Sequence, residues 1–292
     1  MSTAPVPPAR WSPPGTDGAG GSGPASFPVG LMAGLLPETV SVVDALDSSF
    51  DGDRLVHPLP GRRGAAFDAE VRALGGAGPL RRTEFSRARI CAHAAVTALG
   101  RRPEAILIGG HREPRWPAGL AGSITHCTGY RAAAVADARV VLAVGIDAES
   151  DRALPDGIAA LALTAQDRAR SANLARFRHW DCLAFSARES VFKAWFAVTG
   201  CRLDFADATL SLQPDGPLDG EFAATIAPGV PGSHDLLLAA GTAVLHGRYR
   251  WVPGPSSRVL TAVTLRHRVA GPAAPGEVGL AGSGPSPRVA HE

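Results

Sequence analysis

Val140-Val141-Leu142-Ala143-Val144-Gly145-Ile146-Asp147-Ala148-Glu149 is an apolar run that leads into two carboxylates. Residues 140–144 are predicted to form a buried strand, because the run is short and rich in β-branched residues. Successive strand side chains alternate between faces, so Asp147 and Glu149 should point to the same side. Two such carboxylates repel each other unless a cation lies between them, and Mg²⁺ prefers oxygen ligands. A solvated loop just after a strand is the more common explanation of an isolated pair, so other segments must decide.

Composition narrows the class of protein. The chain has 292 residues, of which 45% are hydrophobic and 19% charged, with a formal net charge of +2. This charge is too small to indicate general nucleic-acid binding. There is neither an apolar run of about 18 residues nor a secretory signal pattern, so we expect a cytoplasmic protein without a membrane span. The four cysteines form no C-x-x-C pair, which argues against a structural zinc site.

The two ends of the chain differ in composition from the middle. Residues 1–28 and 270–292 are rich in Gly and Pro, and such segments cannot bury enough apolar surface to fold. We therefore expect two disordered tails around a folded core of about 29–269.

Within the core, the pattern predicts helices and many short strands. Helical spacing of apolar residues is found at 83–99, 161–175 and 180–198. Strand patterns are found at 39–43, 106–108, 122–126, 130–136, 208–212, 222–226, 236–240, 245–252 and 259–265. Because the strands do not alternate regularly with helices, an α+β fold with antiparallel sheets is favoured.

The helix at 83–99 carries candidate phosphate ligands. Thr83 is expected to cap its start and Gly100 to follow its end. Arg81 precedes the helix and Arg89 lies at the border of its apolar stripe. These arginines could cover the edge of the core with their aliphatic stems, or they could bind phosphate in a bidentate manner.

A glycine-containing loop follows the strand at 106–108. Gly109 and Gly110 would let backbone N–H groups approach a ligand, and His111 and Arg112 add donors and positive charge. Most Gly-Gly pairs are simply turns, so this signal is weak alone. Likewise, His126 on the next strand is by itself more typical of a structural residue.

The helix at 180–198 places Glu189 four residues before Lys193. This order favours an intrahelical ion pair of about 0.3–0.5 kcal/mol when exposed, which is the simplest explanation of the pair. The alternative is a catalytic pair on one helix face.

Four segments, taken together, resemble the Sfp-type 4′-phosphopantetheinyl transferases, especially the actinobacterial and enterobactin-synthesis branch. The segments occur in the family's order and with its spacing, and the resemblance covers about 35–265. They are Arg81-Arg82-Thr83-Glu84-Phe85 with Arg89 and Cys91-Ala92, Glu113-Pro114-Arg115-Trp116-Pro117 through Gly122-Ser123-Ile124-Thr125-His126, Gly145-Ile146-Asp147-Ala148-Glu149, and Phe185-Ser186-Ala187-Arg188-Glu189-Ser190-Val191-Phe192-Lys193-Ala194-Trp195.

The resemblance implies transfer of the 4′-phosphopantetheine group of coenzyme A to a serine of an acyl or peptidyl carrier protein of a fatty-acid, polyketide or nonribosomal peptide synthase. It implies two pseudo-duplicated α/β halves, here 29–145 and 146–269, acting as a monomer. Mg²⁺ is then expected on Asp147 and Glu149, with Glu189 facing it and the Ala148 carbonyl joining them. Coenzyme A phosphates are expected at Arg81, Arg89, His111, Thr125, His126 and Lys193, with Asp147 and Glu189 bordering the coenzyme.

Residue chemistry gives the roles in this reaction. Glu189 would accept the serine proton, and Lys193 would offset negative charge on the departing adenosine 3′,5′-bisphosphate. Three positions depart from the family pattern, because Arg188 replaces a lysine, Ile108 stands where a lysine is common, and His111 replaces another basic residue. Two other functions remain open at this point: a Mg²⁺-dependent nucleotide phosphohydrolase and a non-catalytic coenzyme A-binding module.

Overall fold

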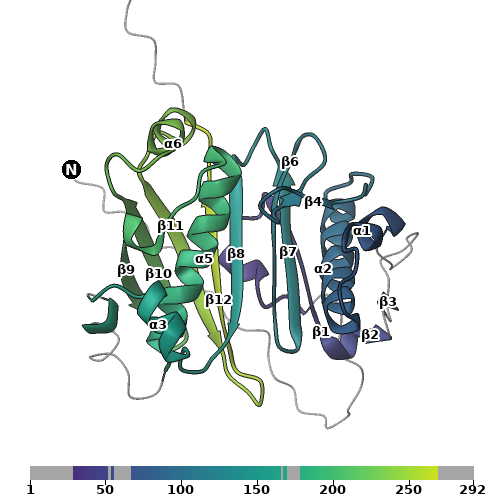
Figure 1. Ribbon diagram of the computed structural model, residues 1–292, viewed down its shortest axis with the longest axis horizontal. Helices are drawn as coiled ribbons and strands as arrows, with labels where there is room; N and C mark the ends of the chain where they lie inside the picture. The colour runs from purple at the N-terminus through teal and green to yellow at the C-terminus, as the bar shows by residue number, and fades with distance from the viewer. Residues whose placement is uncertain (1–28, 52–53, 56–66, 166, 170–177, 269–292) are drawn as a thin grey trace, which may run out of the picture.

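The structure is a computed structural model that describes residues 29–51, 54–55, 67–165, 167–169 and 178–268. Two antiparallel sheets stand side by side, each covered by one long helix (Figure 1). The predicted α+β class is confirmed. Both tails that were predicted to be disordered lie outside the described residues. None of the described helices is both long and apolar enough to cross a membrane.

The first sheet has the strand order β1-β7-β6 and is covered by helix α2 (Figure 1). Its strands are β1 (Val40–Leu46), β6 (Leu120–Cys127) and β7 (Tyr130–Asp137). Around it lie η1 (Ala33–Leu35), η2 (Asp47–Ser49), β2 (Phe50–Asp51), β3 (Arg54–Leu55), α1 (Asp68–Ala73), α2 (Pro79–Ala98), β4 (Leu107–Ile108) and β5 (Pro114–Arg115). Ala133 and Val135 of β7 face α2, whereas Ala132 and Ala134 face the other way, as strand alternation requires.

The second sheet has the order β8-β12-β11-β10-β9 and packs against helix α5. Its elements, with those that surround it, are β8 (Ala143–Ser150), α3 (Asp156–Ala162), α5 (Trp180–Thr199), η3 (Phe205–Asp207), β9 (Ala208–Asp215), β10 (Asp219–Ile226), α6 (Ser233–Ala240), β11 (Val244–Val252) and β12 (Arg258–Leu265). The helix contributes Leu183, Ala187, Val191 and Trp195 to the core of this half.

Strands β6 and β8 lie side by side where the two sheets meet. The N–H of Ile146 donates to Ser123 Oγ at 3.1 Å, and the N–H of Ala148 donates to Thr125 Oγ1 at 3.0 Å. The numbering rises in the same direction on both strands, so they run parallel, joined by side chains instead of a backbone ladder. A polar seam between the two sheets is therefore built from the strand that carries Asp147 and Glu149.

Several predicted elements differ from the structure. The predicted strand at 236–240 is wrong, because these residues belong to helix α6. A continuous helix over 161–175 is also wrong, since α3 ends at Ala162 and Leu163 is extended. Helix α2 begins at Pro79 with Gly78 as its N-cap, so Thr83 is not a cap. Strand β8 begins at Ala143, three residues after the predicted start, and continues through Asp147 and Glu149. The predicted boundary after residue 145 remains a prediction, although it divides β8.

Candidate active site

Asp147 is a buried carboxylate on β8 that three side chains, from helix α5 and strand β6, hold in place. Its Oδ2 accepts a hydrogen bond from Ser186 Oγ of α5 at 2.8 Å. Its Oδ1 accepts from Lys193 Nζ at 2.7 Å and from Thr125 Oγ1 of β6 at 3.3 Å. The carboxylate therefore lies where helix α5 meets the seam between the sheets.

Glu189 lies on the same face of α5 as Ser186 and Lys193, because the spacing of three and four residues returns to one face of a helix. Burial raises the pKa of Glu189, and the charge of Asp147 adds to the increase while Lys193 opposes it. Ser186, three residues before Glu189, and Lys193, four residues after it, both bind Asp147 directly. These contacts support the predicted proximity of Glu189, Lys193 and Asp147.

Glu149 adds a third acidic group to this region. Burial, followed by repulsion from Asp147 and Glu189, raises its pKa to about 7, while Lys193 opposes the rise. The three carboxylates are therefore close enough to repel one another. Of the three carboxylates, Asp147 is the one that forms an ion pair with the Lys193 ammonium group.

The donor set of this region fits a hard divalent cation. Carboxylate and carbonyl oxygens are the ligands that Mg²⁺ prefers, and a cation would offset both the burial and the repulsion that raise the pKa values of the two glutamates. Ala148 can add its carbonyl: its N–H points to β6, and the N–H and C=O of one strand residue point to the same side. Within the described residues, no three His, Cys, Asp or Glu side chains already converge on a metal position.

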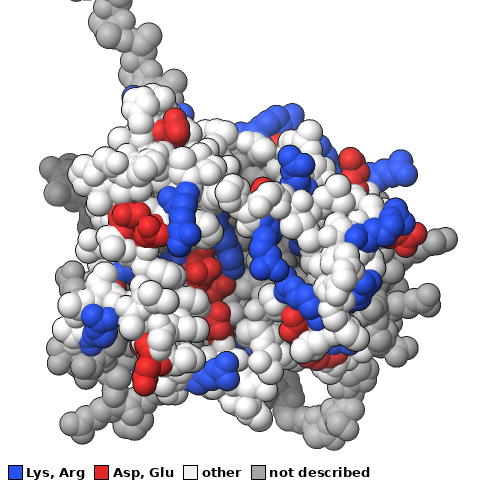
Figure 2. All heavy atoms as spheres, in the orientation of Figure 1, with Lys and Arg blue, Asp and Glu red and all other residues white. Residues whose placement is uncertain are grey.

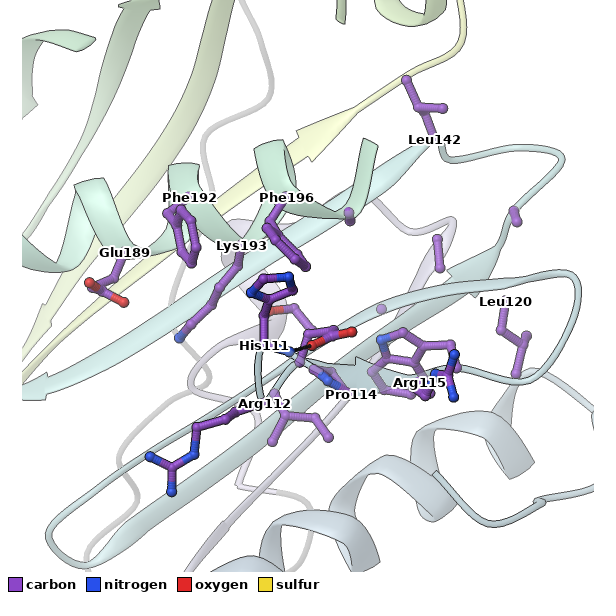
Figure 3. A pocket seen from close by; sticks show the side chains of 18 residues that line it. His111, Arg112, Pro114, Arg115, Leu120, Leu142, Glu189, Phe192, Lys193 and Phe196 are labelled. Atoms are coloured by element: carbon purple, nitrogen blue, oxygen red, sulfur yellow. Dashed lines mark hydrogen bonds between the residues drawn. The ribbon is translucent and has the colours of Figure 1, made fainter. Parts of the chain in front are cut away.

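A pocket of about 640 Å³ opens beside the carboxylates. Its walls come from α5, from β6 and from the β4–β5 hairpin. Figure 3 shows Glu189, Lys193, Phe192 and Phe196 on the helix side, facing His111 of the hairpin. The His111 ring packs edge-on against Phe196, with 5.4 Å between ring centroids. The pocket therefore combines an apolar wall with the cation and the acid of α5 at one side.

Arg81 of α2 and His126 of β6 both lie close to the Glu84 carboxylate. Glu84 Oε2 lies 3.8 Å from Arg81 Nη1 and 3.7 Å from His126 Nε2. Burial lowers the pKa of His126, and the nearby charges of Arg81, Arg131 and Lys193 lower it further, while Glu84 opposes them. Figure 2 shows Lys and Arg side chains on both sides of the seam, with Asp and Glu side chains between them. Several like charges around one hollow suit an anionic ligand.

In the loop between β4 and β5, the N–H groups of Gly109, His111 and Arg112 donate within the loop. The N–H of Gly109 donates to the Glu113 carbonyl at 2.8 Å, and the N–H of His111 donates to Glu113 Oε2 at 2.8 Å. The N–H of Arg112 donates to the Gly109 carbonyl at 3.1 Å. The prediction that Gly109 and Gly110 bring N–H groups to a ligand stays a prediction. In this conformation, the His111 and Arg112 side chains are the available groups at the pocket.

Arg188 lies outside the pocket and is buried. Its Nη1 donates to the carbonyls of Phe205 and Ala208, and its Nη2 donates to Asp167 Oδ2 at 2.6 Å. The departure from the family lysine therefore affects how α5 is anchored. By contrast, Ile108 is half-buried in β4 at the base of the hairpin.

Sequence reasoning missed some contributors. Ser186 and Thr261 fix Asp147 and α5 to each other, since Ser186 Oγ lies 3.0 Å from Thr261 Oγ1. The spacing Ser186, Glu189, Lys193 on one helix face was a signal that could have identified Ser186. Phe192, Phe196 and Trp116, which line the pocket, carried no comparable signal.

The chain was compared with known proteins. Residues 69–136 match the family described as 4′-phosphopantetheinyl transferase N-terminal domain, and residues 143–236 match the 4′-phosphopantetheinyl transferase superfamily. The 4′-phosphopantetheinyl transferase Svp of Streptomyces mobaraensis is 41% identical over 75% of this chain and 84% of its own length. PptT of Mycobacterium tuberculosis is 35% identical over 80% of this chain and 98% of its own. Enterobactin synthase component D of Escherichia coli is 40% identical over 40% of this chain and 56% of its own.

Proposed function

Since this chain belongs to the 4′-phosphopantetheinyl transferase superfamily, we propose that it transfers the 4′-phosphopantetheine group from coenzyme A to a serine hydroxyl of an apo carrier protein, in a Mg²⁺-dependent reaction in the cytoplasm. The single observation that carries the proposal is the bond between Lys193 and Asp147. It places Asp147 against the face of α5 that carries Glu189, beside a pocket with cationic walls. The acceptors would be acyl or peptidyl carrier domains of fatty-acid, polyketide or nonribosomal peptide synthases.

The proposed reaction is a displacement at the phosphorus that bears the pantetheine arm. The serine oxygen forms a bond to this phosphorus, and the bond from the phosphorus to the bridging diphosphate oxygen breaks. The electron pair of that bond leaves with adenosine 3′,5′-bisphosphate, and the serine proton passes to Glu189. Asp147, Glu149, Glu189 and the Ala148 carbonyl would hold Mg²⁺, which when bound would withdraw charge from the diphosphate.

The residues of the chain contribute binding and proton transfer. Glu189 lies at the pocket on the face of α5 whose Lys193 binds Asp147, and this position supports a role as the proton acceptor. Lys193, held at 2.7 Å from Asp147, lies next to the proposed diphosphate position and can offset charge on the departing group. We propose that Arg81, Arg89, His111, Arg112, Thr125 and His126 hold the phosphates of coenzyme A. The apolar wall of Phe192 and Phe196 suits the pantetheine arm.

The proposal is tested by mixing the protein with coenzyme A, Mg²⁺ and apo acyl or peptidyl carrier proteins, and weighing the carrier by mass spectrometry. We expect a gain of one phosphopantetheine group. A phosphohydrolase would cleave coenzyme A without a carrier, and a binding module would leave both unchanged. An unchanged mass across several carriers contradicts the proposal.

Replacement of the proposed base gives a sharper test. Glu189→Gln keeps the shape of the side chain but removes the proton acceptor, so the transfer rate should fall by about 10²–10⁴-fold. Glu221→Gln, at an exposed position of β10, is the control and should retain the wild-type rate. Wild-type transfer by Glu189→Gln would exclude Glu189 as the base.

A further inference from the structure

Glu70 of α1 is a fully buried carboxylate that the proposed chemistry does not use, with 0% of its surface exposed. Its Oε1 accepts a hydrogen bond from the Ile106 N–H at 2.7 Å and lies 2.8 Å from His93 Nε2. Its Oε2 accepts from the Phe67 N–H at 2.9 Å. A buried carboxylate is tolerated only when donors satisfy it, so this one side chain caps its own helix α1 at Phe67 and also joins it to α2 and to Ile106.

Ile106 is held at both of its backbone groups. Glu70 binds its N–H, and the carbonyl of Ile106 accepts a hydrogen bond from Arg89 Nε at 2.9 Å. Arg89 is itself buried and its guanidinium lies 4.4 Å from the centre of the Phe85 ring. Burial lowers the pKa of Arg89 to about 10, against the opposing charge of Glu70. Glu70 and Arg89 thus fix the same residue from two sides.

Ile106 immediately precedes β4, which pairs with β5 to form the hairpin that carries His111 and Arg112. The hairpin forms the wall of the pocket that faces α5 (Figure 3). Because β4 and β5 are only two residues long, their own pairing provides little anchorage. The position of this wall therefore depends on what holds Ile106.

We infer that Glu70 is a positioning residue for coenzyme A: through Ile106 it fixes the β4–β5 hairpin and Arg89 as one wall of the coenzyme site, with His93 supporting it. The inference rests on the proposed function for its ligand. Glu70 acts through Ile106 and does not itself contact the coenzyme.

The variant Glu70→Gln tests the inference with little change in shape. In either orientation of the new amide, its NH₂ group meets a backbone N–H, of Ile106 or of Phe67, and one of these bonds is lost. We expect the KM for coenzyme A to rise about 10-fold, because a misplaced binding wall weakens ground-state binding. The kcat should change less than about 2-fold, because Glu189 and Lys193 lie on α5.

Asp44→Asn is the matched control. Asp44 is also 0% exposed and accepts hydrogen bonds from the N–H groups of Gly30 and Met32 and from the Tyr130 hydroxyl. Loss of the Asp44 carboxylate in Asp44→Asn should lower the Tm, while the KM for coenzyme A should change less than about 2-fold. An unchanged KM in Glu70→Gln, or an equal rise in both variants, overturns the inference.

A second measurement needs no catalysis. Amide hydrogen exchange across 106–116 should become faster in Glu70→Gln, while exchange across β7 stays as in the wild type. Unchanged exchange across 106–116 overturns the inference. If the wild type transfers nothing to any carrier, the proposed function fails, and the exchange result still decides whether Glu70 holds the hairpin.

A milder variant covers the case in which Glu70→Gln does not fold. His93→Gln removes the imidazole that lies 2.8 Å from Glu70 Oε1 and leaves both backbone donors to Glu70 in place. We expect faster exchange across 106–116 and a rise of about 3-fold in the KM for coenzyme A. Wild-type values of both would contradict the inference.

Discussion

Glu149 is a carboxylate whose pKa is raised by burial and by the neighbouring charges of Asp147 and Glu189. Its pKa of about 7 lies above the ordinary glutamate value of 4.5. The folded protein therefore binds more protons than the unfolded chain between these two values, so this residue's contribution to stability falls as pH rises through that window.

The variant Glu149→Gln should remove this pH dependence. From pH 5 to pH 8, without metal, the free energy of unfolding of the wild type should fall relative to that of the variant by about 1–2 kcal/mol, a value reduced for the partial exposure of Glu149. Urea denaturation at both pH values measures this difference. Mg²⁺ at pH 8 should then stabilise the wild type more than the variant. If the free energies of unfolding of the two proteins changed equally with pH, a raised pKa of Glu149 would be excluded.

Arg188 illustrates a departure from the family motif that affects stability instead of the site. Its two terminal nitrogens reach three acceptors, and a lysine has only one nitrogen to offer. Arg188→Lys should lower the free energy of unfolding by about 2 kcal/mol, because buried acceptors lose their donors. Denaturation measures the free energy of unfolding, and a coenzyme A titration measures the KM.

The control for this variant is Arg202→Lys. The Arg202–Asp204 ion pair is exposed, so its change should cost less than about 0.5 kcal/mol. The KM for coenzyme A should stay at the wild-type value in both variants. A large rise in KM for Arg188→Lys alone would place Arg188 in the coenzyme site.

At the scale of elements, the contact of α5 with β8 brings the site together. Gly145 makes this contact possible: a Cβ there would lie 1.9 Å from the Ser190 carbonyl oxygen and 2.9 Å from the Ala194 nitrogen. Both are backbone atoms of α5, so the helix cannot avoid the clash by rotating a side chain. Any larger residue must therefore move α5, and with it Ser186 and Lys193, away from Asp147.

Gly145→Ala should lower the free energy of unfolding by about 1–3 kcal/mol and reduce kcat/KM at least about 10-fold, because the groups on α5 shift relative to those on β8. Gly157→Ala is the control, since a Cβ at this α3 position meets nothing within 4 Å. It should leave the transfer rate unchanged. Wild-type kcat/KM in Gly145→Ala would contradict the proposed coupling between helix position and activity.

How far the sequence predicts this structure differs between elements. The strong periodicities of 130–136 and 180–198 predicted β7 and α5 correctly. The run at 236–240 was assigned to a strand because a short apolar run fits both structures. Its helix has Gly232 (φ 95°) as its N-cap and ends at Gly241 (φ 73°), whose left-handed conformation stops the last turn.

The site was predictable where chemistry lies in a local motif. Asp147, Glu149, Glu189 and Lys193 stand out through spacing and family resemblance, and the structure places Asp147 against Lys193. Glu70 could not be predicted, because its partners Ile106 and His93 are distant in sequence and only the tertiary fold brings them to it. Gly145 did carry a signal, since a glycine inside a strand often marks a close approach of another backbone.

At the scale of the molecule, the site lies on the seam where two separate sheets meet. Ser123 and Thr125 of the first sheet bind the backbone of β8, while α5 of the second reaches Asp147. Neither half carries the complete candidate site: the half around the first sheet supplies the hairpin and most of the basic residues, and the half around the second sheet supplies the carboxylates and Lys193. Binding of a diphosphate across the seam would therefore connect both halves.

In the proposed reaction, the three carboxylates hold one divalent ion together with the diphosphate of coenzyme A. A crystal structure with coenzyme A and Mn²⁺, recorded at the manganese absorption edge, locates this ion directly. We predict one anomalous peak within about 2.0–2.6 Å of oxygens from Asp147, Glu149 and the diphosphate, with Glu189 beside it. A bound coenzyme whose diphosphate lies away from Asp147, or a metal peak elsewhere, would contradict this metal site.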